Sequence, residues 1–309
     1  MEPRSKSPRG LLWVAAGACL WGTDTLFRRT LTAHLNSITI VFLEHAVLAP
    51  VLLPVLWTRR LQLQKLRPRD WVAVAAIAWG GSALATVFFT EAVRVGNPSI
   101  AVLLQKSQPV FAGGLAGLLL SEPLGARFWM RMAGAIAAAY LISFGAALPQ
   151  AGGVTGAALL ALAAAALWGA STVLGRYVLG SVPPVVLTAL RVTIALPLLA
   201  AIAWFRGSLP LPGIGAAQAV CLVLMALIPG LAGLVVYYRG LQNCLASRAA
   251  VAELCFPATA VLLNWLFFDA RISLAQGSGF ALLTIIILSW QSRGIVRDQG
   301  PKNDTRQIP

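Results

Sequence analysis

The sequence has few charged residues, which excludes an ordinary soluble domain. Only 11% of its 309 residues are charged, whereas soluble domains have about 25%. Hydrophobic residues make up 58% of the chain, and its mean hydropathy is +0.79. Much of the chain must therefore lie in lipid. We expect a polytopic membrane protein whose main surroundings are the bilayer.

Metal ligands and catalytic groups are also scarce. The four cysteines form no CxxC motif, and two histidines cannot build a metal cluster with them. No nucleophile–base pair and no pair of neighbouring carboxylates suggests catalysis. We therefore predict no metal, no cofactor, no catalytic residues and no enzymatic activity.

The net charge of +14 does not indicate a nucleic-acid partner, because the basic residues are not gathered in one patch. They stand in short clusters between apolar runs, as in membrane proteins. No obligate protein partner is evident either. The basic clusters instead separate stretches of about 20 apolar residues, the length that crosses a bilayer as a helix. These stretches predict an all-α transmembrane fold with ten helices, at roughly 11–28, 38–57, 71–90, 99–119, 128–147, 155–174, 185–204, 216–236, 249–268 and 272–291.

The distribution of lysine and arginine predicts the orientation of these helices. With a cytoplasmic N-terminus, 17 of the 24 basic residues fall on the cytoplasmic side and five on the other. The remaining two, Lys106 and Arg191, lie within spans. Cytoplasmic segments carry the excess of basic residues, so we predict that both termini are cytoplasmic.

The two halves of the chain repeat each other. The segment ACLWGTDTLFRR (18–29) resembles AALWGASTVLGR (165–176), which aligns Trp21 with Trp168. Further on, Pro109 aligns with Pro257. We predict a first five-helix unit at 1–150, a second at 151–295 and a cytoplasmic tail at 296–309. Because five is odd, the second unit must be inverted, and inverted repeats around a central cavity are typical of alternating-access transporters.

These features resemble the drug/metabolite transporter superfamily, in its EamA-type ten-helix branch. The motifs are LWG followed by an arginine in each half, the run PVFAGGLAGLLLSEPL (109–124) and a weaker counterpart, PATAVLLNWLFFDA (257–270). The resemblance implies a carrier of small molecules in the bacterial inner membrane, exporting amino acids that are aromatic or largely apolar. Another metabolite or drug-like compound, or a passive channel, are the alternatives. It also implies that Trp168 and the segment before Pro109 line the cavity.

Four charged residues lie inside the predicted spans, where an unpaired charge is costly. They are Glu44 and Lys106 in the first half, and Arg191 and Glu253 in the second. The family often has an arginine early in the second helix of each half; Arg191 fits this pattern, but Glu44 stands at its counterpart. One hypothesis is a structural ion pair in each half, Glu44 with Lys106 and Arg191 with Glu253.

The second hypothesis gives Lys106 a role in binding. A cavity-facing lysine would attract a substrate carboxylate, and Glu253 or Glu44 would bind an ammonium group. Gln105 and Gln108 could donate and accept hydrogen bonds beside it. A third possibility is that the Lys106 side chain simply extends toward the membrane surface.

Several other residues could shape such a site. Proline cannot donate a helical hydrogen bond, so Pro109 and Pro257 predict bent helices that face the cavity, although a packing kink is the alternative. Trp21 and Trp168 are predicted to line the cavity, and Trp79 to line it or pack in the core. Asp24 lies four residues before Arg28, which suits an ion pair on a helix surface, with proton coupling as the other possibility.

Overall fold

The computed structural model describes residues 9–96, 98–147, 155–209, 213–267 and 271–297, and every regular element in these ranges is a helix. The first half contains α1 (Arg9–Gly22), α2 (Asp24–Thr32), α3 (Ser37–Thr58), α4 (Arg60–Leu63), α5 (Pro68–Ala75), η1 (Ala76–Leu84), α6 (Ala85–Val95), α7 (Pro98–Gln105), α8 (Gln108–Leu120) and α9 (Ala126–Phe144). The second half contains α10 (Thr155–Val178), α11 (Pro184–Phe205), α12 (Ala216–Met225), η2 (Ala226–Gly233), α13 (Leu234–Leu241), α14 (Ala246–Ala252), α15 (Cys255–Phe267) and α16 (Leu274–Arg297).

These helices occupy the ten predicted spans, several of which are divided into shorter helices. Within the described ranges, seven continuous or nearly continuous helices are long and apolar enough to cross a membrane. They are 9–32, 37–58, 68–95, 156–178, 184–205, 216–241 and 246–267. The remaining predicted spans correspond to the broken pair α7 and α8, to α9, and to α16, whose apolar part is 274–290. The chain is therefore a multi-pass membrane protein.

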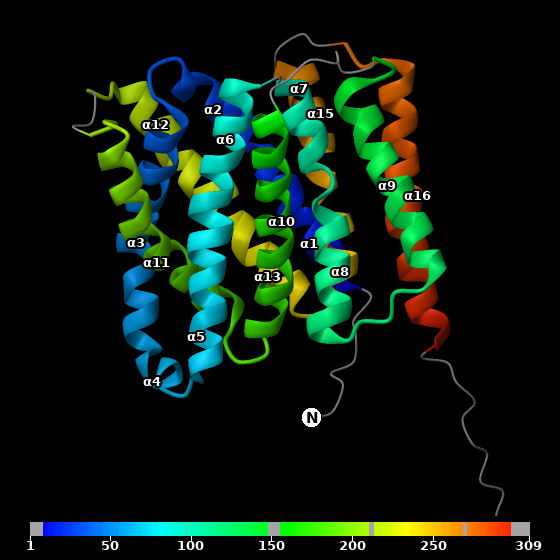
Figure 1. Ribbon diagram of the computed structural model, residues 1–309, viewed down its shortest axis with the longest axis horizontal. Coiled ribbons are helices and arrows are strands. Elements are labelled where there is room, and N and C mark those ends of the chain that lie inside the picture. The colour runs from blue at the N-terminus through cyan, green and yellow to red at the C-terminus, as the bar shows by residue number, and fades with distance from the viewer. Residues whose placement is uncertain (1–8, 97, 148–154, 210–212, 268–270, 298–309) are drawn as a thin grey trace, which may run out of the picture.

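The second half is inverted relative to the first. In Figure 1, α10 (green) runs downward from the upper side, whereas α1, its counterpart in the repeat, starts on the lower side. The last described helix, α16, ends on that same lower side. The first helix and the last helix thus have their outer ends on one face of the molecule, called the terminal face below.

Each half carries the same irregularity in its third helix. The chain widens into a π-helix at η1 and again at η2, which begin 150 residues apart. Single π-turns in α-helices often mark functional positions. The equivalence of the two segments indicates that the repeat extends to local backbone geometry.

Small residues let helices from the two halves approach closely. A Cβ placed on Gly240 of α13 would lie 2.4 Å from the Val14 nitrogen of α1, so only glycine fits there. Membrane helices depend on such contacts, because lipid gives no hydrophobic drive to associate. The pairs α3 with α11 and α9 with α16 also pack side by side. The halves are therefore interleaved around one centre rather than separate.

Candidate substrate-binding site

A cavity of about 590 Å³ lies between the two halves, with walls from both. The cavity extends toward the face opposite the terminal face. Its lining includes Ser37 at the start of α3, Val93 near the end of α6 and Val102 in α7, and the start of α3 and the end of α6 lie on that opposite side in Figure 1. A cavity of this size suits a drug-sized ligand, for which pockets of about 300–1,000 Å³ are usual. Every predicted site residue except Trp79 lines it: Trp21, Asp24, Glu44, Gln105, Lys106, Gln108, Pro109, Trp168, Arg191, Glu253 and Pro257.

Lys106 lies where the fourth span is broken. Helix α7 ends at Gln105 and α8 begins at Gln108, so the lysine occupies the two-residue interruption between them. The Lys106 side chain is only 4% exposed, and its ammonium nitrogen is 6.0 Å from the centre of the Phe256 ring. Among the described residues it makes no hydrogen bond or ion pair. The structure thus presents a cation to the cavity with only an aromatic ring beside it.

Glu44 is a second charged group in the cavity wall whose side chain has no hydrogen bond or ion pair among the described residues. Its Oε1 packs against η2, where a Cβ placed on Gly230 would lie only 2.9 Å away. The charged groups that act on it electrostatically are Arg28, Asp24 and Arg191. The predicted ion pair between Glu44 and Lys106 is wrong, because the two groups face the same cavity without coming within 4.0 Å.

Arg191 on α11 is held by hydroxyl groups rather than by a carboxylate. Its Nε donates to Ser82 Oγ at 2.6 Å, and its Nη1 lies 3.0 Å from Tyr238 Oη and 3.4 Å from Ser171 Oγ. Three hydroxyl oxygens replace the water that the guanidinium group would otherwise bind. The second predicted ion pair, Arg191 with Glu253, is therefore also absent. Because Ser82 belongs to η1, this network joins the two halves.

Glu253 lies at the break of the ninth span, between α14 and α15. Its carboxylate accepts hydrogen bonds from Gln108 Nε2 at 2.5 Å, Tyr237 Oη at 2.7 Å and Thr172 Oγ1 at 2.9 Å. Gln108 comes from the first half and the other two donors from the second. A carboxylate with three donors is well satisfied in a buried site. Glu253 therefore connects the two halves in the wall of the cavity.

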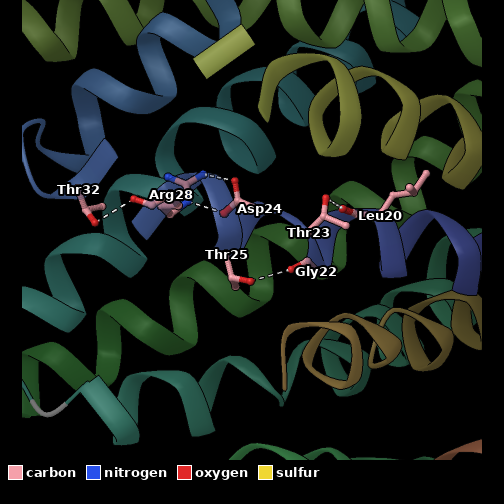
Figure 2. A network of polar contacts seen from close by, with 7 residues as sticks. All are labelled: Leu20, Gly22, Thr23, Asp24, Thr25, Arg28 and Thr32. Carbon is pink, nitrogen blue, oxygen red and sulfur yellow. Dashed lines mark hydrogen bonds and ion pairs between the residues drawn. The ribbon is translucent and has the colours of Figure 1, made fainter. Parts of the chain in front are cut away.

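The break in the first span places an ion pair at the cavity wall. Figure 2 shows Asp24 facing Arg28, whose Nε and Nη2 donate to its two carboxylate oxygens at 2.5 and 2.9 Å. Beside the break, the Thr23 and Thr25 hydroxyls donate to the carbonyl oxygens of Leu20 and Gly22. The four-residue spacing thus forms the expected ion pair, and the pair is half-buried. Proton coupling at Asp24 stays a prediction.

The prolines interrupt both repeat-related helices, as predicted. Pro109 and Pro257 each follow a break, after Ser107 and Leu254 respectively. Pro257 cannot donate to the carbonyl group of Glu253 four residues earlier, which predicts a free carbonyl group there, but that prediction is wrong. The carbonyl group accepts a hydrogen bond from the Phe256 backbone nitrogen at 3.0 Å, since the chain tightens into a shorter turn there.

Of the three tryptophans predicted for the site, two line the cavity and one lies on the outer surface. Trp21 lies 4.7 Å from the Tyr237 ring and Trp168 lies 5.6 Å from the Phe89 ring, centre to centre. Trp79 does not face the cavity or the core. It is 49% exposed and donates its indole hydrogen to the Ile194 carbonyl oxygen at 3.0 Å. Its indole faces outward because its one polar atom is satisfied by the neighbouring helix.

Sequence reasoning missed the hydroxyl groups that hold the site together, and His45. Thr172 could have been found, because it aligns with Thr25 in the repeated segment. The adjacent tyrosines Tyr237 and Tyr238 could also have been found, because two hydroxyl groups next to each other are unusual in a long apolar span. His45 gave none; its Nδ1 lies 2.8 Å from the Val41 carbonyl oxygen, and the residue lines the cavity.

Inverted repeats around a central cavity with charged side chains in its wall, within a multi-pass helical protein, are the architecture of a membrane transporter. The EamA-like transporter family model matches the chain twice, at residues 8–144 and 155–289. The chain belongs to the EamA-like transporter family.

Two similar proteins extend this result. The riboflavin transporter ImpX of Fusobacterium nucleatum subsp. nucleatum is 29% identical over 291 residues, which cover 91% of this chain and 96% of that protein. A solved crystal structure matches with a TM-score of 0.75 and 19% identity, covering 95% of this chain and 100% of its own. At that identity the second likeness supports the fold alone.

Proposed function

We propose that the protein is an alternating-access carrier for a small metabolite with an aromatic ring, which binds in the central cavity. The observation that carries this proposal is the cavity lining. It combines aromatic side chains from both halves with an ammonium group, Lys106, that has no hydrogen-bonding partner among the described residues. A buried cation without a partner is costly unless a ligand or water satisfies it.

Riboflavin is the first candidate substrate, because the similar protein ImpX is named a riboflavin transporter. A flavin ring has two aromatic faces and a polar edge with carbonyl oxygens. Trp21 and Trp168 offer surfaces for stacking, and Lys106 and Gln105 offer donors for the polar edge. The cavity volume of about 590 Å³ leaves room for a ligand larger than an amino acid.

Aromatic amino acids, as carried by the exporter YddG that the sequence resembles, are the second candidate. A zwitterion needs one cationic and one anionic partner. Lys106 and Glu44 are such a pair, since they face the same cavity without binding each other. Glu253 suits the ammonium group less well, because three donors already occupy its carboxylate.

The excess of basic residues on the terminal face supports a cytoplasmic location for both termini. We propose that the protein resides in a bacterial inner membrane with the cavity open to the outside in this conformation. Export toward the outside is the direction that we propose for amino acids.

The test is uptake or efflux of labelled riboflavin and of aromatic amino acids in proteoliposomes, with and without a pH gradient. Lys106→Met should weaken transport of the true substrate by about tenfold or more, because it removes a charge-assisted hydrogen bond. Lys65→Met is the matched control, since Lys65 is exposed and does not line the cavity.

Saturable transport with mutual competition between substrates is the expected result and would separate a carrier from a passive channel. Equal transport by the Lys106 and Lys65 variants would contradict the role of Lys106. Transport that does not saturate would contradict the carrier.

A further inference from the structure

A second, smaller hollow of about 190 Å³ lies near the terminal face, apart from the central cavity. Its walls are the link between α8 and α9, the first turns of α9, the start of α14 and α16. It shares no lining residue with the central cavity. The two hollows are therefore separate.

Three arginines from both halves line this hollow. Arg127 and Arg131 lie one turn apart on α9, and Arg248 stands opposite them on α14. Like charges at this spacing repel each other on a helix surface. Three guanidinium groups around a small hollow therefore favour an anion between them.

Among the described residues, the carboxylate that acts on Arg248 is Glu122, and its oxygens are bound elsewhere. Glu122 accepts hydrogen bonds from the Ala246 backbone nitrogen at 2.7 Å, from the Ser247 backbone nitrogen at 3.0 Å and from Ser247 Oγ at 2.5 Å. It acts on Arg248 electrostatically but does not lie within 4.0 Å of it. Its oxygens are already occupied, and it does not line the hollow.

In one wall of the hollow, the guanidinium group of Arg131 lies over the ring of Trp290. The Trp290 ring is buried, and the Arg131 Cζ lies 5.7 Å from its centre. An arginine that stacks on an aromatic ring keeps its planar fork pre-organised, and the fork geometry matches phosphate oxygens. Met130 of α9 and Leu118 of α8, the two helices that the link in the wall of the hollow joins, are 72% and 81% exposed.

We propose that this hollow is a phosphate-binding site, formed by Arg127, Arg131 and Arg248. Basic pockets between transmembrane helices at the cytoplasmic side bind anionic lipid headgroups. The phosphate comes either from the headgroup of an anionic phospholipid or from a soluble phosphate. The site joins the two halves of the chain, since α9 belongs to the first half and α14 to the second.

The experiment measures binding to the purified full-length protein in detergent. Native mass spectrometry follows titration with phosphatidylglycerol and with phosphatidylcholine, and thermal unfolding follows titration with inorganic phosphate. We expect the wild-type protein to prefer phosphatidylglycerol, or to be stabilised by phosphate in a saturable way. Arg127→Gln and Arg248→Gln should each weaken that binding by about tenfold, the effect of one charge-assisted contact.

The matched control is the double variant Arg59→Gln/Arg60→Gln. Its Arg60 also lies over a tryptophan, 4.9 Å from the Trp57 ring centre, but outside both cavities. This control should bind as the wild type does. Arg127 is exposed, so its variant keeps the test valid if Arg248→Gln fails to fold.

The two phosphate sources give different results. A preference for phosphatidylglycerol with no response to inorganic phosphate identifies a lipid, and saturable stabilisation by phosphate with no lipid preference identifies a soluble ligand. The proposal is overturned if neither response occurs, or if the control variant loses binding as much as the Arg127 variant does.

Discussion

The fourth and ninth spans break at equivalent points, yet the two breaks hold opposite chemistry. Each break lies two or three residues before a proline, Pro109 in one half and Pro257 in the other. The first exposes Lys106, which has no polar partner among the described residues, to the cavity. The second holds Glu253, which has three hydrogen-bond donors. The repeat thus supplies one backbone feature twice, and the side chains give it two different roles.

The two breaks therefore have different roles: we propose that Lys106 binds a ligand, whereas Glu253 holds the two halves together. The lysine is available to a ligand because nothing in the described protein occupies it. The glutamate is not available, because its partners from both halves already use its oxygens. Substitutions at the two breaks should therefore have opposite effects on stability and transport.

The largest effect should come from Glu253→Ala. Loss of the carboxylate removes the acceptor of Gln108 and Thr172, whereas Tyr237 keeps the Thr172 hydroxyl oxygen at 3.1 Å, so two groups lose a partner at about 1–3 kcal/mol for each. We expect a loss of about 2 kcal/mol or more in the free energy of unfolding, measured by thermal or denaturant unfolding in detergent. Glu253→Gln keeps an acceptor oxygen and should lose less. An unchanged unfolding midpoint for Glu253→Ala would contradict the connecting role.

An intermediate effect is expected at the two π-helices. In Gly81→Ala, the new Cβ would lie 2.5 Å from Ser171 Oγ, so α10 or η1 must shift, at a cost of about 1–3 kcal/mol. In Gly230→Ala, it would meet the flexible end of Glu44 at 2.9 Å, which can move more easily. We expect Gly81→Ala to lower the unfolding temperature more than Gly230→Ala does. The opposite order would show that Glu44 is held more firmly than its lack of hydrogen bonds indicates.

A smaller effect should follow Trp79→Leu. This change removes one hydrogen bond to the Ile194 carbonyl group, worth about 0.5–1.5 kcal/mol, and leaves the cavity intact. Transport should stay at the wild-type level. Trp168→Leu is the comparison, because Trp168 lines the cavity and its loss should reduce transport. Equal transport by both variants would contradict the assignment of the tryptophans.

The smallest change in stability should come from Lys106→Met. The methionine fills nearly the same volume, and the lost ammonium group had no hydrogen bond or ion pair among the described residues. We expect the free energy of unfolding to change by less than about 1 kcal/mol, even where transport falls. A destabilisation as large as that of Glu253→Ala would mean that Lys106, too, has a structural role.

The transmembrane fold was predictable because lipid imposes simple rules on sequence. The ten apolar stretches, five in each repeat, and the paired prolines were enough to predict ten helical spans, inverted halves and bends in the fourth and ninth spans. The π-helices at 76–84 and 226–233 were not predictable. A π-helix differs from an α-helix by one residue in the spacing of its backbone hydrogen bonds, and that difference leaves no clear mark in an apolar stretch.

The residues of the site were easier to predict from the sequence than their hydrogen-bonding partners. Sequence position placed Lys106, Glu44 and Glu253 inside the membrane, where charge is rare. It did not give their partners, because an ion pair and a set of hydroxyl contacts satisfy a buried charge equally well. Trp79 was misplaced for a related reason: both the lipid side and the core side of a membrane helix are apolar, so periodicity does not separate them.

The hydrogen bonds that connect α8 with α14 have a consequence for the kinetics of transport. Gln108 at the start of α8 binds Glu253 just after α14, and Glu122 just after α8 binds Ser247 in α14. These hydrogen bonds tie α8 to α14 at both ends. In the alternating-access cycle that we propose, opening toward the terminal face requires these ties to separate. A solute that competes for the Gln108 Nε2 hydrogen donated to Glu253 frees Glu253 from one tie at the moment of binding, whereas the empty carrier receives no such help. We therefore expect exchange of solute for solute to run faster than net movement in one direction.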